Sequence, residues 1–283
     1  VSDLGFLSAA KQAAPDLEIH ISTQANCLNY MAARAYYELG AKRVVLAREC
    51  TLEEIDDIRA HVPDTLESEA FVHGAMCMAY SGRCLISSFL TGRDSNRGDC
   101  AQACRWNYAL MEEKRPGEYF PIEEDAGGTT LLSSYDLNLI EHLDALRQAG
   151  LDSLKIEGRM KSAGYVATVT NAYRKALDGE SNFPLLQREL HSVSHREFST
   201  GFYFNELRIH PASQGVYLQD CVFAAIVRQS AAGQAVVEQK NKFSLGDTLE
   251  ILSPGSLGLS FTLEQMWDAD TGLPLQSAPH PAG

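Results

Sequence analysis

Long apolar segments are absent from this sequence, and basic residues are few. No run of 18 or more apolar residues occurs, so no membrane-crossing helix is expected. The first residues lack the basic and apolar regions of a secretory signal, and we therefore expect a cytoplasmic protein without a membrane partner. The chain has 24 Lys and Arg against 37 Asp and Glu, a net charge of −13. Such a chain does not coat nucleic acid through its bulk charge, although a local basic patch could still contact RNA.

The seven cysteines are an odd number in a large chain with no secretory signal, so metal binding or burial is expected instead of disulfides. Four of them fall within 28 residues rich in Gly, Ser, Asn and Arg: Cys77, Cys84, Cys100 and Cys104. Such a segment predicts a loop around a ligand, and four thiolates can hold either a zinc ion or an iron–sulfur cluster. The wide first spacing suits the bulkier cluster, but spacing does not identify the metal. The alternative is small buried hydrophobic residues, which we adopt for Cys27, Cys50 and Cys221.

The first two thirds of the chain alternate between strand and helix patterns. Buried strands are predicted at residues 18–23, 43–48, 69–73, 130–133 and 153–157. Apart from one long gap between the third and fourth strands, which contains the four clustered cysteines, their starts recur roughly every 25 residues, the length of one strand–helix unit in a (β/α)8 barrel. Five strands cannot close such a barrel, whereas an open doubly wound sheet could use five. The pattern alone therefore leaves both α/β folds open.

Helix signals lie between these strands. Thr51 and Glu54 have the spacing of a capping box, which predicts a helix start. A later helix is predicted with Asp136 as its N-cap and with an apolar stripe of Leu137, Ile140, Leu143 and Leu146. Another is predicted over residues 162–177. After residue 204, short apolar runs between turn signals predict a small all-β domain that resembles a barrel, at residues 216–218, 222–228, 235–239, 248–252 and 259–263.

Several blocks of the sequence resemble the signature of the collagenase-like "peptidase" family of unknown catalytic type. Residues 69–88 fit the form E-x-F-x-x-G-x-x-C followed by S-G-x-C-x-x-S. The similarity continues in four further blocks: 96–106, 153–159, 194–202 and 240–247. The resemblance implies a TIM-type (β/α)8 barrel, and we expect this chain to be a fragment that lacks the first strands. The predicted domains are a partial barrel over residues 1–211, with the cysteine-rich insertion 77–104, and a C-terminal β domain over residues 212–283.

The same resemblance implies an activity and a cofactor. Residues 104–106 and 115–119 are most similar to the branch that forms 5-hydroxyuridine at the wobble position of tRNA, independently of oxygen and with prephenate as co-substrate. Family members carry a 4Fe–4S cluster on four cysteines, which match Cys77, Cys84, Cys100 and Cys104. Sister branches hydroxylate ribosomal RNA or a quinone precursor, the latter as paired homologous subunits. We therefore expect an RNA-modifying hydroxylase whose partners are a tRNA anticodon loop, prephenate and a homologous subunit.

Functional groups of (β/α) barrels lie at the carboxyl ends of the strands, and this rule selects candidates for binding prephenate. Arg48 lies at the end of the second predicted strand, and Lys155 and Arg159 lie at the fifth. Prephenate carries two carboxylates, which planar guanidinium groups bind through paired hydrogen bonds. The alternative is an internal ring of Arg and Glu side chains, including Glu49 and Glu157, that closes the barrel mouth. The sequence assigns no catalytic residue.

Segment 83–115 carries an excess of positive charge beside aromatic side chains. The candidates for RNA contact are Arg83, Arg93, Arg97, Arg105 and Trp106, which could meet an anticodon loop through phosphate contacts and base stacking. A solvated loop surface is the alternative. A collagenase-like peptidase is the competing function, but the sequence contains neither G-x-S-x-G nor H-E-x-x-H. A His73–Cys77 nucleophile pair would lose Cys77 to the cluster.

Overall fold

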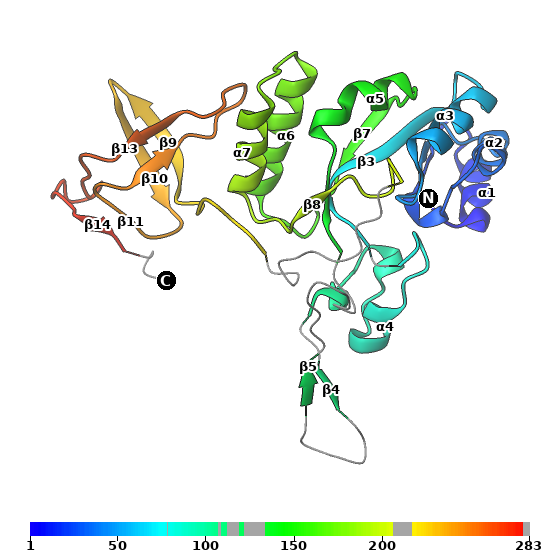
Figure 1. Cartoon of the computed structure of the whole chain (residues 1–283), viewed down its shortest axis with the longest axis horizontal. Helices are drawn as coiled ribbons and strands as arrows, with labels where there is room; N and C mark the ends of the chain where they lie inside the picture. The colour runs from blue at the N-terminus through cyan, green and yellow to red at the C-terminus, as the bar shows by residue number, and fades with distance from the viewer. Residues whose placement is uncertain (78, 107–108, 112–118, 122–133, 206–216, 280–283) are drawn as a thin grey trace. The chain divides into compact units, whose positions relative to one another are not determined.

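The structure is a computed structural model of the 283-residue chain, and it describes residues 1–77, 79–106, 109–111, 119–121, 134–205 and 217–279. The chain divides into two compact units, whose elements Figure 1 labels. The first comprises Val1–Arg159 and His195–Tyr217, and the second comprises Met160–Ser194 and Leu218–Gly283. The domain boundary predicted between residues 211 and 212 lies outside the described residues.

A six-stranded sheet forms the centre of the first unit, with the strand order β1-β2-β3-β6-β8 and with β7 also paired to β3. The strands are β1 (His20–Ile21), β2 (Arg43–Val45), β3 (Glu67–Ala75), β6 (Asp136–Asn138), β7 (Ser153–Ile156) and β8 (Phe198–Ser199). β1, β2, β3 and β7 run parallel. The end of β3 pairs with β6 in antiparallel fashion, and β6 pairs in parallel with β8. The described strands form an open path, so the fold is mixed α/β and the predicted TIM-type barrel is not confirmed.

Helices precede β1 and lie between the later strands of the first unit. They are α1 (Leu4–Ala13), α2 (Tyr30–Glu38), α3 (Leu52–His61), α4 (Ile86–Thr91) and α5 (Leu143–Gln148), with the 3-10 helices η1 (Thr23–Ala25), η2 (Ser95–Arg97), η3 (Ala103–Arg105) and η4 (Ile140–His142). A hairpin of β4 (Ala109–Met111) and β5 (Tyr119–Pro121) follows the cysteines. The chain order β1-α2-β2-α3-β3 gives two successive crossover units, as expected for parallel strands. Ile55 and Ile58 of α3 are buried, as are Val44 and Val72 of the sheet, and they belong to the core.

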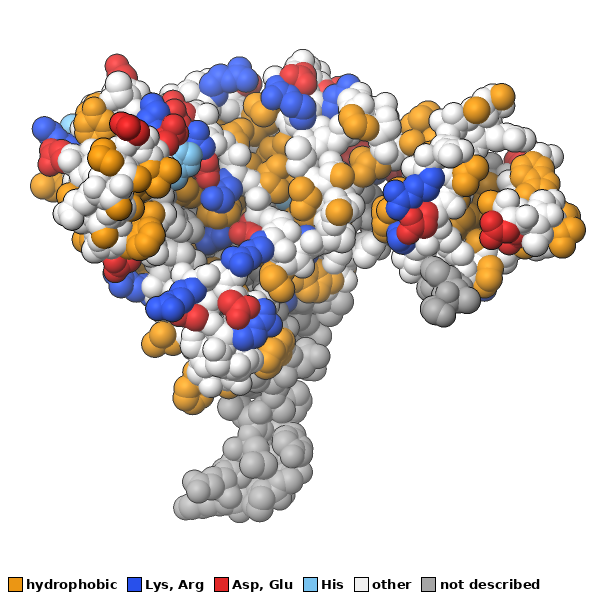
Figure 2. Space-filling view, turned by 180° about the vertical axis from the view of Figure 1, so that it is seen from behind, with side chains coloured by type: hydrophobic (Ala, Val, Ile, Leu, Met, Phe, Trp, Pro, Cys, Tyr) orange, Lys and Arg blue, Asp and Glu red, His pale blue; other side chains and the backbone are white. Residues whose placement is uncertain are grey.

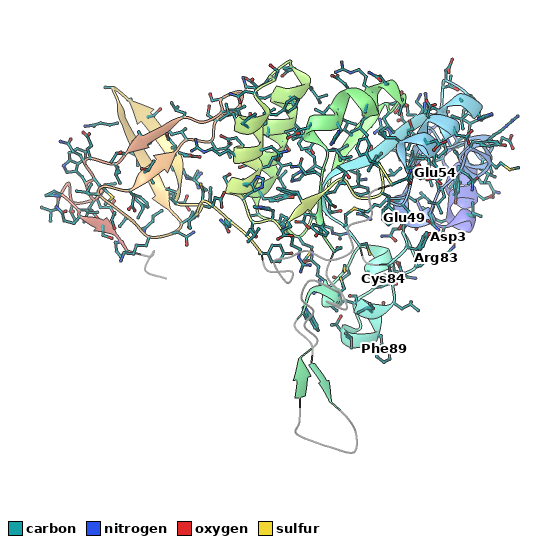
Figure 3. The ribbon with its side chains drawn as sticks, viewed as in Figure 1. Asp3, Glu49, Glu54, Arg83, Cys84 and Phe89 are labelled. Carbon is teal, nitrogen blue, oxygen red and sulfur yellow. The ribbon has the colours of Figure 1, made fainter. Side chains whose placement is uncertain are left out.

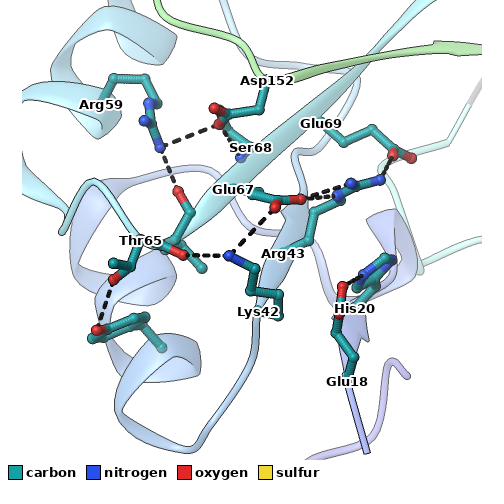
Figure 4. A network of polar contacts seen from close by, with 12 residues as sticks. Glu18, His20, Lys42, Arg43, Arg59, Thr65, Glu67, Ser68, Glu69 and Asp152 are labelled. Atoms are coloured by element: carbon teal, nitrogen blue, oxygen red, sulfur yellow. Dashed lines mark hydrogen bonds and ion pairs between the residues drawn. The ribbon is translucent and has the colours of Figure 1, made fainter.

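The strand β3 carries charged side chains at alternate positions, and these form a network of ion pairs (Figure 4). Arg43 of β2 contacts Glu67 at 2.6 Å and Glu69 at 2.9 Å. Lys155 of β7 lies 3.0 Å from the other carboxylate oxygen of Glu69. Burial raises the pKa of Glu69, but hydrogen bonds from Lys155, Ser153 and Arg43 outweigh it and leave the pKa below its ordinary value. Around Glu69, this face of the sheet therefore carries paired charges next to the buried side chains of Val45 and Phe71.

The local predictions have mixed outcomes. The capping box is confirmed, because the Thr51 hydroxyl accepts from the Glu54 amide at 3.2 Å and Glu54 accepts from the Thr51 amide at 2.8 Å. The helix predicted from Leu137 is wrong in its first turns, because residues 136–138 pair with β3 as β6 and α5 begins only at Leu143. Asp136 is buried in β6 and accepts from the Arg196 amide at 3.1 Å, so it is no N-cap. The strand predicted at residues 130–133 lies outside the described residues.

The second unit combines two helices with short antiparallel strands. Its elements are α6 (Ala163–Leu177), α7 (Phe183–Ser192), β9 (Ala225–Ala231), β10 (Gln234–Gln239), β11 (Phe243–Ser244), β12 (Thr248–Glu250), β13 (Ser260–Thr262) and β14 (Ser277–Ala278). The strands pair as β9–β10, β11–β14 and β12–β13, and those that the structure describes form no closed barrel. Asn171 of α6 exchanges hydrogen bonds of 2.8 Å with Gly255 and Ser256, which ties α6 to the β12–β13 loop. None of the described helices is long and apolar enough to span a membrane.

Gly74 in β3 lies directly against the backbone that follows β7. Its φ is +104°, and a Cβ there would lie 2.3 Å from the carbonyl oxygen of Glu157. We expect Gly74→Ala to lower the free energy of unfolding by at least about 2 kcal/mol, because backbone strain and overpacking add. Urea unfolding measures this loss. Gly92→Ala is the matched control, since Gly92 has φ +73° with nothing within 4 Å of the added Cβ. Equal losses in the two variants would contradict the role of the Glu157 contact.

Candidate active site

Arg48 follows β2 and lies near the carboxyl ends of the parallel strands. Its guanidinium carbon is 3.9 Å from the centroid of the Phe71 ring, and its Nη2 is 3.5 Å from Oε2 of Glu157. Its side chain is 12% exposed, and the buried Nε has no hydrogen-bond partner among the described residues. Burial lowers the pKa of Arg48, whereas the charges of Glu157 and Cys77 raise it. A buried guanidinium with an unused N–H is suited to receive an anionic ligand.

The two other predicted cations lie at different places. Nζ of Lys155 is 5.3 Å from the centroid of the Phe71 ring, in addition to its contact with Glu69. A Cβ on Gly98 would lie 2.0 Å from Nη1 of Arg159, so this guanidinium packs on the Gly98 backbone. The structure therefore brings Arg48 and Lys155 together at Phe71. It places Arg159 against the cysteine segment, residues 77–104.

The two glutamates of the predicted internal ring have separate partners. Glu157 pairs with Arg48, as the ring requires, and its Oε1 accepts from the Arg159 amide at 2.9 Å. Glu49 instead binds Ser81, accepting from the amide at 2.9 Å and from the hydroxyl at 3.0 Å. Figure 3 shows Glu49 beside the start of the segment that leads through Arg83 to Cys84. Glu49 therefore fastens the cysteine segment to the sheet instead of completing a ring.

Gly82, next to Ser81, also lies against the backbone that follows a strand. Its φ is +75°, and a Cβ there would lie 2.0 Å from the carbonyl oxygen of Gln24, which follows β1 in η1. The side-chain oxygens of Gln24 and Asn26 are buried and have no hydrogen-bond partner among the described residues. Buried polar atoms without a hydrogen-bond partner among the described residues thus follow both β1 and β2, on Gln24, Asn26 and Arg48.

The four candidate ligand cysteines lie on loops and a short helix between β3 and β4. Cys77 is exposed, and the other three are half-exposed. Atoms packed around the Cys77 sulfur raise the pKa of its thiol above the ordinary value, although a hydrogen bond from the Ala79 backbone and the charge of Arg48 lower it; nearby Cys84 and Cys104 raise it further. The Gln102 amide donates to Sγ of Cys100 at 3.2 Å. Within the described part of the chain, no three His, Cys, Asp or Glu side chains lie together as a metal site. Cys77 is thus the cysteine that has Arg48, Cys84 and Cys104 as neighbours, and the thiols are not placed as ligands of one metal site.

The remaining cysteines do not belong to this group. Cys27 and Cys50 are buried, and Sγ of Cys50 donates to the Cys27 carbonyl at 3.7 Å. Burial raises the pKa of Cys27 to about 11 and that of Cys50 to about 12, so both stay protonated thiols at neutral pH. Cys221 is half-exposed instead of fully buried. The structural role predicted for Cys27 and Cys50 agrees with this burial.

The RNA-contact candidates that the structure describes are at the surface. Arg83, Arg93 and Arg97 are exposed, and Trp106 is 48% exposed. Arg93 pairs with Asp99 at 2.9 Å, and Arg97 lies 3.4 Å from Asp94. The side chain of Arg105 lies outside the described part of the structure. The cations are therefore accessible, and two of them are partly neutralised by neighbouring aspartates.

Comparison with known proteins places this architecture in a family. The sequence profile of peptidase family U32 matches residues 1–211, and the profile of the U32 C-terminal domain matches residues 219–283. The chain belongs to peptidase family U32. The family suggested by the blocks around the cysteines is thereby confirmed.

Relatives of this U32 chain include RNA-modifying proteins. The tRNA hydroxylation protein P of Escherichia coli (strain K12) is 37% identical over 321 aligned positions, which cover 95% of this chain and 69% of that protein. The 23S rRNA 5-hydroxycytidine C2501 synthase of the same organism is 41% identical over 178 positions, which cover 63% of this chain and 25% of that protein. A solved structure, the U32 peptidase Mk0906, is 16% identical with a TM-score of 0.29, over 55% of this chain and 52% of that chain.

Three residues of this U32 site were not predicted as functional from the sequence. Phe71 is the aromatic residue of the E-x-F block and was interpreted only as part of a buried strand. Ser81 and Gly82 open the S-G-x-C block, and their roles depend on contacts with Glu49 and Gln24 that lie far away in the sequence. The block pattern was the available signal in each case, because it fixes residue types that a plain loop or strand does not need.

Proposed function

We propose that this chain belongs to an RNA-modifying hydroxylase that forms 5-hydroxyuridine at the wobble position of tRNA. The observation that carries this proposal is its 37% identity to tRNA hydroxylation protein P across 95% of the chain. The relative that acts on ribosomal RNA supports hydroxylation of a pyrimidine in the same family. Prephenate is the proposed co-substrate in place of molecular oxygen.

The proposed cofactor is a 4Fe–4S cluster held by Cys77, Cys84, Cys100 and Cys104. Four thiols on one irregular segment are the donor set that such clusters use. The Gln102 amide that donates to Cys100 is the kind of hydrogen bond that supports a ligating thiolate. A cluster with four cysteine ligands would supply electron transfer or structural support.

Prephenate is proposed to bind through Arg48, with Lys155 and Arg159 as further cations. Support comes from the unused Nε of buried Arg48 and from Lys155 at the same aromatic ring. Binding a carboxylate would satisfy that N–H, and a charge-assisted hydrogen bond is stronger in a buried site than in water. The proximity of Arg48 to Cys77 would then place the co-substrate next to the cysteine segment.

The tRNA anticodon loop is proposed to contact Arg83, Arg93, Arg97, Arg105 and Trp106. Accessible guanidinium groups and an exposed indole on the same segment suit phosphate contact and base stacking.

We also propose that the parallel strands form part of a TIM-type barrel, that a homologous subunit pairs with the chain, and that the enzyme works in the cytoplasm.

Mass spectrometry of RNA nucleosides tests the proposal. A strain without the gene should lose 5-hydroxyuridine and its derivatives from tRNA, and the wild-type gene should restore them. Unchanged tRNA together with loss of 5-hydroxycytidine from ribosomal RNA would move the assignment to the ribosomal substrate. Collagen cleavage by the purified protein, with both RNAs unchanged in the deletion strain, would contradict the proposal and support a peptidase.

A further inference from the structure

The short helix α4 exposes its apolar side chains and buries a serine. Phe89 is 87% exposed, and Leu85, which precedes the helix, is 70% exposed. Ser87 is only 1% exposed, and its hydroxyl accepts from the Ala101 amide at 2.9 Å. Figure 3 shows Phe89 on the outer side of α4. Polar contacts therefore fix α4 on the cysteine segment in the orientation that leaves its apolar side outward, although burial of apolar surface is normally favourable. We name Leu85, Phe89 and the 46%-exposed Leu90 the α4 patch.

Arginines accompany the α4 patch in an otherwise acidic chain. Residues 79–106 contain four Arg, two Asp and no Lys or Glu, whereas the whole chain has a net charge of −13. The Arg93 backbone is tied to α4, because its amide donates to the Thr91 hydroxyl at 3.3 Å and its carbonyl accepts from the Ser88 hydroxyl at 3.4 Å. The side chain of Arg97 is 87% exposed and lies 3.4 Å from Asp94, and Arg93 pairs with Asp99 at 2.9 Å, so a phosphate would compete with these two aspartates. In Figure 2, basic, acidic and hydrophobic side chains lie next to one another in this part of the first unit.

We propose that the α4 patch is a base-stacking surface for RNA, on which Phe89 stacks against an unpaired base while Arg93 and Arg97 contact the flanking phosphates. The inference rests on the proposed action on RNA and extends it to residues outside the arginine and tryptophan candidates. An exposed aromatic ring on a segment that also carries exposed arginines suits single-stranded nucleic acid, because every base offers a π-face and the phosphates attract the guanidinium groups. A protein partner fits less well, since a stable interface buries about 800 Å² on each side, far more than three side chains supply.

Binding of fluorescently labelled tRNA to the full chain tests this surface. Phe89→Ala should weaken binding about tenfold, the effect of losing one base stack. Phe89→Trp should keep wild-type affinity, because it restores a stacking ring. Met31→Ala is the matched control, since Met31 is an apolar residue of α2 that is 69% exposed and remote in the sequence from the cysteine segment. Its affinity should equal that of the wild type.

The salt dependence of binding separates stacking from charge. Phe89→Ala should leave the slope of log Kd against log salt unchanged, because stacking releases no counterions. Arg97→Ala should reduce that slope by about 0.7, the value for one phosphate contact to a single strand. Unchanged tRNA affinity in Phe89→Ala would overturn the inference, as would a Phe89→Ala chain that loses only self-association.

The nucleoside assay keeps this inference separate from the proposed function. A wild-type chain that forms no hydroxylated nucleoside, together with a tenfold weaker Phe89→Ala complex, would reject the hydroxylase and retain the stacking surface. Restored hydroxylation by the wild type, together with full affinity in Phe89→Ala, would reject the stacking surface alone.

Discussion

Cys84→Ala should abolish both bound iron and tRNA hydroxylation. Wild-type protein purified without oxygen should be brown and contain about four irons per chain, as a 4Fe–4S cluster requires. Removing one thiolate leaves an incomplete ligand set, so iron and activity should fall to background. The substitution should spare the local fold, because Cys84 is fixed there through its carbonyl, which accepts from Ser95 at 3.2 Å and from Asn96 at 2.7 Å.

Cys221→Ala is the matched control for this experiment. Cys221 is also half-exposed, but it lies in the second unit and outside the cysteine segment. Its iron content and activity should equal those of the wild type. A Cys84→Ala protein that keeps its iron, or a colourless wild-type protein that holds zinc, would contradict the cluster. Full activity without iron would show that a cluster takes no part in the reaction.

Arg48→Gln should lower kcat/KM for prephenate about 100-fold, the effect of losing roughly 3 kcal/mol from a buried charge-assisted contact. The loss should appear mainly as a higher KM, because the guanidinium is proposed to bind the co-substrate in its ground state. The kcat/KM of Arg48→Lys should fall between those of the wild type and Arg48→Gln, since an ammonium keeps the charge without the planar pair of donors. Initial rates of 5-hydroxyuridine formation against prephenate concentration give these values.

Glu157→Gln tests whether Arg48 binds prephenate or only forms an internal ion pair. It removes the partner 3.5 Å from Arg48 while leaving the guanidinium in place. If Arg48 binds prephenate, Glu157→Gln should keep the KM near that of the wild type. If the pair only holds the strand ends together, both variants should lose stability and activity alike. Equal losses in the two variants would therefore reject Arg48 as a prephenate ligand.

The parallel part of the sheet could be predicted because its signals are local. Strands expected at 43–48, 69–73 and 153–157 correspond to β2, β3 and β7, and the capping box at Thr51 marks the start of α3. At Leu137, by contrast, the local pattern predicts the wrong element. Its spacing to later leucines is helical, but pairing with β3, more than 60 residues earlier, places it in a strand. A helical pattern carries no information about that partner.

In the candidate site, too, the local sequence predicts some residues, whereas contacts between residues far apart in the sequence could not be predicted. Arg48 and the cysteines could be selected by residue type and by position after strands. The attachment of Ser81 to Glu49 joins residues 32 positions apart, and the ring of Phe71 under Arg48 depends on the register of two strands. The outward face of α4 runs against the usual rule that apolar side chains point inward. Its orientation is set by the buried hydroxyl of Ser87, which sequence pattern does not reveal.

The most direct test of an RNA hydroxylase built on the cysteine segment is the reaction of the purified protein. Iron-containing protein prepared without oxygen should convert tRNA from the deletion strain to its 5-hydroxyuridine form when prephenate is added, and the product should be absent without prephenate. If iron-containing protein binds both the tRNA and prephenate but forms no 5-hydroxyuridine, the proposed function is wrong.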